Sequence, residues 1–186
     1  MIDGCNTVAE MAAIGMGLER NTFSSLMKRG PHKLAPTGSD LTRYKIGTIF
    51  AGFHYDFNFL TIHGKSRYPG LFAWLRTGEK FSVAVPEGHL LLQAGHQFEW
   101  VTGGYINCGF HEVIYTPQVE ERKNQAIKEG RIPWRVSSTL FSHIRGDVTL
   151  EPFGKFATAD ALKKYPPILA SEHAAQELEA IKLKRT

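Results

Sequence analysis

The stretch FHYDFNFLT, residues 53–61, places an imidazole and a carboxylate two positions apart, at His54 and Asp56. In a β-strand, two such side chains point to the same side. The neighbouring apolar residues predict a buried setting for both: Phe53, Phe57, Phe59 and Leu60. Burial of two polar groups is costly unless they pair with each other or bind a metal ion. These residues therefore leave two interpretations, a hydrogen-bonded pair or a metal site.

A third candidate ligand, His111, follows Asp56 by 55 positions, in the stretch INCGFHEVIYT. That interval leaves room for several strands to run out and return to the same face. Two histidines and one carboxylate on one side of a metal form the facial triad of non-haem Fe(II) oxygenases, which keeps the opposite side open for substrate and oxygen. Taken alone, His111 is more typical of a structural histidine in a core.

A basic group and a hydroxyl lie two positions apart in the stretch WRVSSTLFSHI, at Arg135 and Ser137. On a strand they share one face. The guanidinium fork beside a hydroxyl is suited to binding a carboxylate through two hydrogen bonds. The alternative for Arg135 is a surface ion pair with the charged segment 117–134. The combination of HxD, a distant His and RxS favours the carboxylate site.

Other residues that could do chemistry are predicted to be structural. Cys108 lies close to His111, but an added thiolate would block the open side of the metal. Five histidines have no partner at metal spacing along the chain: His63, His89, His96, His143 and His173. Trp100 and Tyr105 are expected in the core, with the lining of a pocket as the alternative. Further aromatic residues are predicted to be core: Phe57, Phe59, Trp74, Phe81 and Phe98.

Short runs rich in β-branched and aromatic residues alternate with Gly, Pro and Asn between Leu41 and Tyr115. Many short strands separated by turn residues are typical of a sandwich or barrel. The runs cover residues 43–64, 70–78, 79–88, 89–95, 98–104 and 111–116. Residues 135–144 predict one further strand. The chain is therefore expected to have a small, mainly β core.

Helices are expected at both ends of this core. Apolar spacing over residues 6–29 predicts an amphipathic helix that is broken near Gly15–Gly17, and residues 30–40 read as a loop. The charged segment 117–134 is expected to be partly helical. Residues 158–186 predict a C-terminal helical region that is broken at Pro166–Pro167.

Length and composition exclude several classes. The 186 residues are 42% hydrophobic and 22% charged, which fits one globular domain or one domain with a tail. The net charge of +4 is spread along the chain, which disfavours a nucleic-acid partner, and the basic end KLKR is expected to be a solvated face. Two cysteines make no disulfide framework and favour the reducing cytoplasm. No apolar run has the length of a signal peptide or a membrane span.

The ordered motifs resemble one family. They are HYD at 54–56, LT at 60–61, PGL at 69–71, LLLQAGHQFEWVTGG at 90–104, HEV at 111–113 and RVS at 135–137. In this order they are similar to the iron- and 2-oxoglutarate-dependent dioxygenases of the isopenicillin N synthase-like group. The resemblance covers roughly residues 41–153. It implies a double-stranded β-helix, or jelly roll, with flanking N- and C-terminal helices.

The resemblance also implies roles for these residues. His54, Asp56 and His111 would hold Fe(II), and no catalytic residue is expected beyond them. Arg135 and Ser137 would hold the distal carboxylate of the cosubstrate 2-oxoglutarate. The family often has a tyrosine that contacts cosubstrate or substrate, and Tyr44 in LTRYKIG falls at that place. The implied reaction oxidises a small organic substrate with molecular oxygen and decarboxylates 2-oxoglutarate to succinate.

The resemblance implies a division of the chain and leaves alternatives. Residues 1–40 would be the helical remnant of a longer family N-terminus, residues 41–153 the jelly-roll domain, and residues 154–186 a C-terminal helical region. One alternative is an oxidase of the same family that uses iron and oxygen without 2-oxoglutarate. Another is a truncated jelly roll that binds metal or a partner without turnover. A third is a cupin-like zinc or manganese protein, which the RxS strand disfavours.

Overall fold

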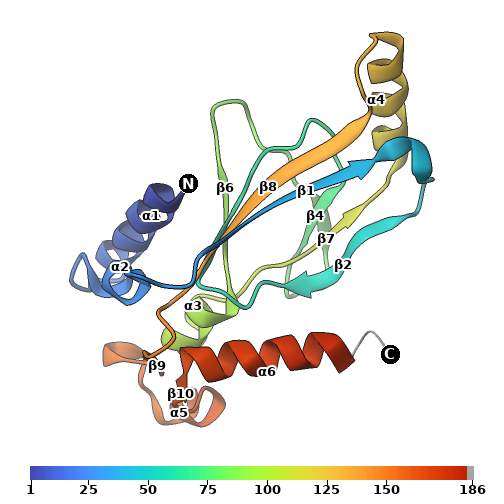
Figure 1. Cartoon of the computed structure of the whole chain (residues 1–186). Helices are drawn as coiled ribbons and strands as arrows, with labels where there is room; N and C mark the ends of the chain where they lie inside the picture. The colour runs from blue at the N-terminus through green and yellow to red at the C-terminus, as the bar shows by residue number, and fades with distance from the viewer. Residues whose placement is uncertain (184–186) are drawn as a thin grey trace.

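Two four-stranded antiparallel sheets form the centre of the molecule in this computed structural model, which describes the backbone of residues 1–183 (Figure 1). The first, called the β8 sheet, has the order β1 (Lys33–Asp40), β8 (Trp134–Ser142), β3 (Leu60–His63), β6 (Leu91–Ala94). The second, called the β2 sheet, has the order β2 (Ile49–Tyr55), β7 (Phe110–Ile114), β4 (Leu71–Trp74), β5 (Lys80–Ser82). A small pair joins β9 (Thr149–Leu150) to β10 (Ile168–Leu169). The predicted mainly β jelly roll with flanking helices is confirmed.

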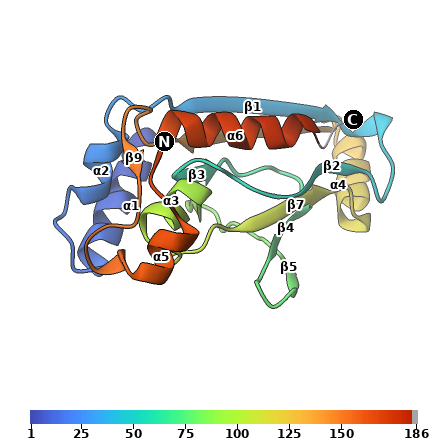
Figure 2. The same cartoon turned by 90° about the horizontal axis from the view of Figure 1, so that it is seen from below.

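Helices flank the two sheets. They are α1 (Ile2–Gly15), α2 (Thr22–Met27), α3 (His96–Val101), α4 (Pro117–Lys128), α5 (Ala159–Lys164) and α6 (Ala170–Leu183). Short 3-10 turns cover Leu41–Arg43 and Gly154–Phe156. Figures 1 and 2 place α1 and α2 at one end of the sheets and α4 at the other, with α6 running below the sheets on the side of β1 and β2. In the described part of the chain, no helix is long and apolar enough to cross a membrane.

In strand β3, alternate residues contribute to the core and to the space between the two sheets. Its side chains alternate between the two faces of the sheet. Leu60 and Ile62 point into the main apolar cluster, where α1 packs on the sheet. Thr61 and His63 point the other way, toward the space between the two sheets. The outer face of the β8 sheet therefore supports the fold, while its inner face is left for polar groups.

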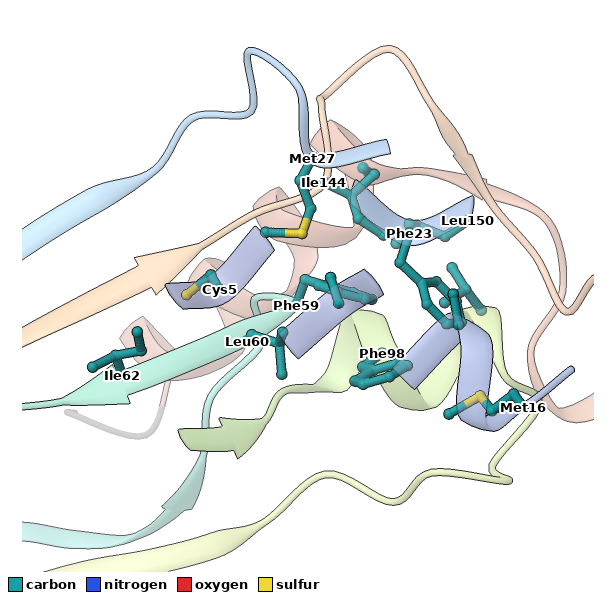
Figure 3. Packing of buried hydrophobic residues seen from close by; sticks show 14 of the residues in the cluster. Cys5, Met16, Phe23, Met27, Phe59, Leu60, Ile62, Phe98, Ile144 and Leu150 are labelled. Atoms are coloured by element: carbon teal, nitrogen blue, oxygen red, sulfur yellow. The ribbon is translucent and has the colours of Figure 1, made fainter. Parts of the chain in front are cut away.

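The main core lies between α1, α2, α3 and the outer face of the β8 sheet (Figure 3). Phe23 of α2 is fully buried, and its ring centroid is 5.6 Å from that of Phe59 and 5.1 Å from that of Phe98. Offset and edge contacts of this kind add to the free energy gained from apolar burial. Small residues let α1 approach the sheet closely, and Cys5 and Ala9 are fully buried. The N-terminal helices are thus part of the core.

Several predicted elements are confirmed. The N-terminal helix breaks between α1 and α2, the charged segment contains α4, and residues 134–142 form β8. The prolines at 166 and 167 separate α5 from α6, as predicted. The basic end KLKR, residues 182–185, lies outside the residues whose side chains are described.

Two predicted elements are wrong. Residues 33–40 are strand β1 rather than a loop, because they pair with eight consecutive residues of β8. The run at 98–104 is not a strand, because α3 covers its first half. The backbone N–H groups of His96 and Gln97 donate to the carbonyls of Asp56 and Asn58, respectively. These bonds lie in the first turn of α3. In both segments, contacts with distant parts of the chain determine the secondary structure.

The burial of some aromatic residues also differs from the prediction. Phe59 and Phe98 are buried as expected. Phe53 is 56% exposed, and Phe81 and Tyr105 are exposed as well. Phe53 and Phe81 lie on the β2 sheet and belong to neither of the two buried apolar clusters. They were predicted to be core because the sequence shows hydrophobicity but not which sheet face is covered.

Candidate metal and cosubstrate site

The three predicted metal ligands come together at one end of the β2–β7 pair. His54 of β2 and His111 of β7 are direct cross-strand partners, with ring centroids 4.2 Å apart. Asp56 follows the end of β2, and its Oδ1 lies 3.7 Å from Nε2 of His54. One ligand atom from each residue lies within 4.8 Å of the others. A single ion could therefore contact all three side chains.

Hydrogen bonds to nearby residues orient His54 and Asp56 toward the site. Nδ1–H of His54 donates to the carbonyl oxygen of Gly52 at 2.6 Å, which leaves Nε2 with its lone pair facing Asp56. Oδ2 of Asp56 accepts from the hydroxyl of Thr61 at 2.7 Å, so Oδ1 is left toward the site. Partners of this kind set the orientation and tautomer of metal-binding side chains.

Gln93 of β6 connects His111 of the β2 sheet to His63 of the β8 sheet. Nε2 of Gln93 lies 2.8 Å from Nδ1 of His111 and donates to the carbonyl of Gly109 at 2.6 Å. Oε1 of Gln93 lies 3.2 Å from Nε2 of His63. The amide thus lies on the Nδ1 side of His111, and Nε2 would bind a metal ion in the tautomer whose Nδ1–H donates to the carbonyl of Gly109. Burial lowers the pKa of His111 to about 4, so its ring is neutral at pH 7.

A cavity of about 460 Å³ lies between the two sheets. Its wall includes all three candidate ligands and, from β8, Arg135 and Ser137. Ser39 and Thr37 of β1 pair with these two residues, and Oγ of Ser137 lies 3.0 Å from Oγ1 of Thr37. The cavity therefore joins the HxD…H residues of one sheet to the RxS residues of the other.

Arg135 carries an unpaired polar atom in this cavity wall. Its buried Nε has no hydrogen-bond partner among the described residues, and burial lowers the pKa of the guanidinium. A buried donor without an acceptor costs free energy unless a ligand or water provides one. A carboxylate is the acceptor whose geometry matches this group. The observation fits an anionic ligand beside the three candidate metal ligands.

Two other predicted residues have a different setting. Tyr44 is 42% exposed, and its ring packs edge-on against Phe50 at 5.1 Å. The described wall of the cavity does not include it, so its role toward a cosubstrate stays a prediction. Cys108 is a buried free thiol, and burial together with Glu99 raises its pKa to about 12. That setting agrees with the structural role predicted for it.

Thr61 and Gln93 had no predicted role of their own at the site, and His63 was predicted to be structural. The alternation of residues along β3 could have indicated Thr61 and His63 as residues of the site, because both lie on the face opposite Leu60 and Ile62. Gln93 has no comparable signal. It reaches His111 because β6 pairs with β3, with Thr61 opposite Gln93.

The donor set fits the two groups that the sequence implies. Neutral imidazole and carboxylate are the ligands that non-haem Fe(II) sites use. Three ligand atoms at one side of a cavity leave the remaining positions of an ion open toward that cavity. The unpaired guanidinium nitrogen fits a carboxylate-bearing cosubstrate.

Comparisons with known proteins agree with this fold. No protein-family model and no curated protein matches the chain. A Caulobacter crescentus protein assigned to the 2OG-Fe(II) oxygenase family matches with 27% identity and a TM-score of 0.77, over 97% of this chain and 56% of that one. Neurospora crassa T7H in complex with alpha-KG matches with 22% identity and a TM-score of 0.74, over 95% of this chain and 55% of that one.

A plant enzyme extends the comparison. The dioxygenase for auxin oxidation 1 from Arabidopsis thaliana, solved with 2-oxoglutarate, matches with 21% identity and a TM-score of 0.68, over 86% of this chain and 55% of that one. The chain thus spans about half the length of the solved relatives that it matches. Its two sheets share the fold of these solved proteins.

Proposed function

We propose that the protein is an Fe(II)- and 2-oxoglutarate-dependent oxygenase of the isopenicillin N synthase-like group. It oxidises a small organic substrate with molecular oxygen and decarboxylates 2-oxoglutarate to succinate. The observation that carries the proposal is the unpaired Nε of Arg135 in the same cavity wall as His54, Asp56 and His111. A metal site without a carboxylate site would not explain that buried donor.

In the proposed site, each ligand is oriented by its own contact. Gly52 holds the tautomer of His54, Thr61 holds the carboxylate of Asp56, and Gln93 holds the ring of His111. Bound ferrous iron would supply the activation of oxygen. The protein orients the reactants around the ion and keeps bulk water away from them.

Arg135 and Ser137 bind the distal carboxylate of the cosubstrate in this proposal. The guanidinium donates through its unpaired Nε–H, and the hydroxyl of Ser137 adds a second donor. Because both residues lie on β8 and the metal ligands lie at β2 and β7, the cosubstrate spans the space between the sheets. The cavity volume of about 460 Å³ suits a small ligand and a small substrate.

The remaining expectations belong to the same proposal. The three-part division at residues 40 and 153 is proposed with one amendment, because β1 pairs with β8 and belongs to the jelly roll. We place the protein in the cytoplasm because Cys5 and Cys108 are both free and buried. The proposed partners are the substrate and oxygen, with no nucleic acid or membrane.

An anaerobic titration tests the proposal. Purified metal-free protein receives Fe(II) and then 2-oxoglutarate, while the weak visible charge-transfer band is recorded. The band is expected only when both components are present. His54→Ala should abolish it, and Arg135→Met should shift its appearance to at least tenfold higher 2-oxoglutarate concentration.

Two matched variants control for general damage. His89→Ala removes an exposed histidine whose Nδ1 lies 2.9 Å from the Glu87 carbonyl oxygen, and Arg131→Met removes an exposed arginine just before β8. Both should leave the band unchanged. Binding of iron without any band would favour the oxidase or the non-catalytic protein. Folded protein that binds no iron at this site would make the metal assignment wrong.

A further inference from the structure

A second group of potential metal ligands lies outside the cavity. Nδ1 of His96 lies 2.7 Å from Oε1 of Glu177 and 3.1 Å from Nε2 of His173. The third distance, between Nε2 of His173 and Oε1 of Glu177, is 3.7 Å. The three atoms come from α3 and α6, and His96 and His173 are 77 positions apart in the sequence. The prediction that these two histidines have no partner at metal spacing is therefore wrong.

We propose that His96, His173 and Glu177 form a second site for a divalent transition-metal ion, with Zn(II) as the preferred ion. Two imidazoles and one carboxylate are a ligand set that zinc uses in proteins. With bonds of about 2.0–2.1 Å, neighbouring tetrahedral ligands lie about 3.3–3.4 Å apart. The three separations bracket that value, so an ion can enter with small side-chain adjustments.

The surroundings of His173 support a ligand at its Nε2. The residue is 2% exposed, and its Nδ1 has no hydrogen-bond partner in the part of the chain that the structure describes. All polar contacts given for this ring therefore converge on Nε2, the atom that faces His96 and Glu177. The ring of Trp100 packs edge-on against both histidines and shields the group on one side.

Two of the proposed ligands lie one helical turn apart on α6. His173 and Glu177 are separated by four residues on α6, so their side chains lie on one face of the helix. His96 is the first residue of α3, and a hydrogen bond from its backbone N–H to the carbonyl of Asp56 fixes its position. Partial exposure of His96 and Glu177 leaves a route for an ion and for a water in the fourth position.

The site joins the C-terminal helix to the strand that carries His54. The hydroxyl of Tyr55 donates to the carboxylate of Glu177, 3.2 Å from each oxygen, and the backbone N–H of His96 donates to the carbonyl of Asp56 at 2.8 Å. Figure 1 shows α6 running beneath β2. A bound ion would therefore hold α6 in place directly behind the proposed iron site. This inference does not depend on the oxygenase activity.

Counting metal equivalents separates the two sites. Metal-free full-length protein is titrated with Zn(II) against a chromophoric chelator, and with Co(II) to record its absorption. Wild type is expected to bind two equivalents, one of which gives the intense visible bands of tetrahedral Co(II). His54→Ala should retain that equivalent with its bands. Glu177→Gln should lose it while keeping the other, and His54→Ala/Glu177→Gln should bind neither tightly.

Further variants and melting curves distinguish the loss of a metal ligand from misfolding of the variant. Glu177→Gln preserves the shape of the side chain and a hydrogen bond to Tyr55, so it should fold even where His173→Ala does not. Zn(II) should raise the melting temperature of His54→Ala but not of His54→Ala/Glu177→Gln. Glu172→Gln, an exposed change on the same helix, is the matched control and should behave as wild type.

Two results would overturn the inference. One is a wild-type protein that binds a single equivalent, lost on His54→Ala, which would make the cluster a hydrogen-bonded network only. The other is a Glu177→Gln protein that keeps both equivalents at unchanged affinity. Failure of the oxygenase proposal would leave a different signature, because the tetrahedral Co(II) bands would remain while no 2-oxoglutarate band appears.

Discussion

His54 and His111 lie directly opposite each other in the β2–β7 pair, and their ring centroids are 4.2 Å apart. Cross-strand partners hold their side chains at a separation that the backbone sets. The two imidazoles are thus positioned by the sheet rather than by a loop. Asp56, which follows the end of β2, completes the group because Thr61 on β3 holds its carboxylate.

Thr61→Val should weaken iron binding about tenfold, within the range known for residues that contact metal ligands. The change keeps the shape of the side chain and removes the only hydroxyl that donates to Oδ2 of Asp56 among the described contacts. Thr61→Ser, which restores the hydroxyl, should recover most of the affinity. Competition with a chromophoric Fe(II) chelator measures the dissociation constants. Equal affinity in Thr61→Val and wild type would show that this contact does not orient Asp56.

Gly95→Ala should lower the free energy of unfolding by at least about 2 kcal/mol, as expected for a change that forces backbone to move. A Cβ at Gly95 would lie 2.0 Å from the carbonyl oxygen of Asn58. The segment there also positions His96 and Asp56 through their backbones. Gly15→Ala meets nothing within 4 Å and lies in α1, so it should be neutral or stabilising. Urea denaturation of both variants provides the comparison.

Phe23→Ala should destabilise the protein by about 3–5 kcal/mol, the usual range for removal of a buried aromatic ring. Its ring contacts those of Phe59 and Phe98 in the main core. Phe53→Ala is the matched change at an exposed ring and should cost much less. The two free energies of unfolding, measured in parallel, test whether α2 is part of the core. Similar small losses for both would place α2 outside it.

The pH dependence of stability should contain a contribution from His143. Burial, followed by the charges of His32 and Lys33, lowers the pKa of His143 from 6.5 to about 4 in the folded protein. The unfolded chain therefore takes up this proton at higher pH than the folded one. The contribution is complete above pH 6.5 and is lost as the pH falls from about 6.5 to about 4, up to about 3 kcal/mol.

His143→Gln removes this titration and tests the assignment. In chelator-treated protein, its free energy of unfolding should fall less steeply than that of wild type between pH 6.5 and pH 4. His89→Gln, at an exposed position, should follow the wild-type curve. Parallel slopes for His143→Gln and wild type would mean that His143 is accessible to protons in the folded state.

The sequence by itself determined the candidate ligands, their order along the chain and the mainly β architecture. Period-two spacing paired His54 with Asp56 and Arg135 with Ser137, and the resemblance to the dioxygenase family supported His111 as the third candidate ligand. The same local rules predicted the broken N-terminal helix and the helix within the charged segment. These features depend on neighbours along the chain, which the sequence displays directly.

Only the tertiary structure decided which distant segments meet. Strand β1 forms because β8 offers a partner, and α3 forms where the chain bonds back to Asp56 and Asn58. His96 meets His173 and Glu177 because α6 packs against α3 and the end of β2, and no spacing along the chain encodes that approach. Exposure of Phe53 likewise depends on which sheet face a helix covers. Such contacts arise from packing between elements, so local patterns do not predict them.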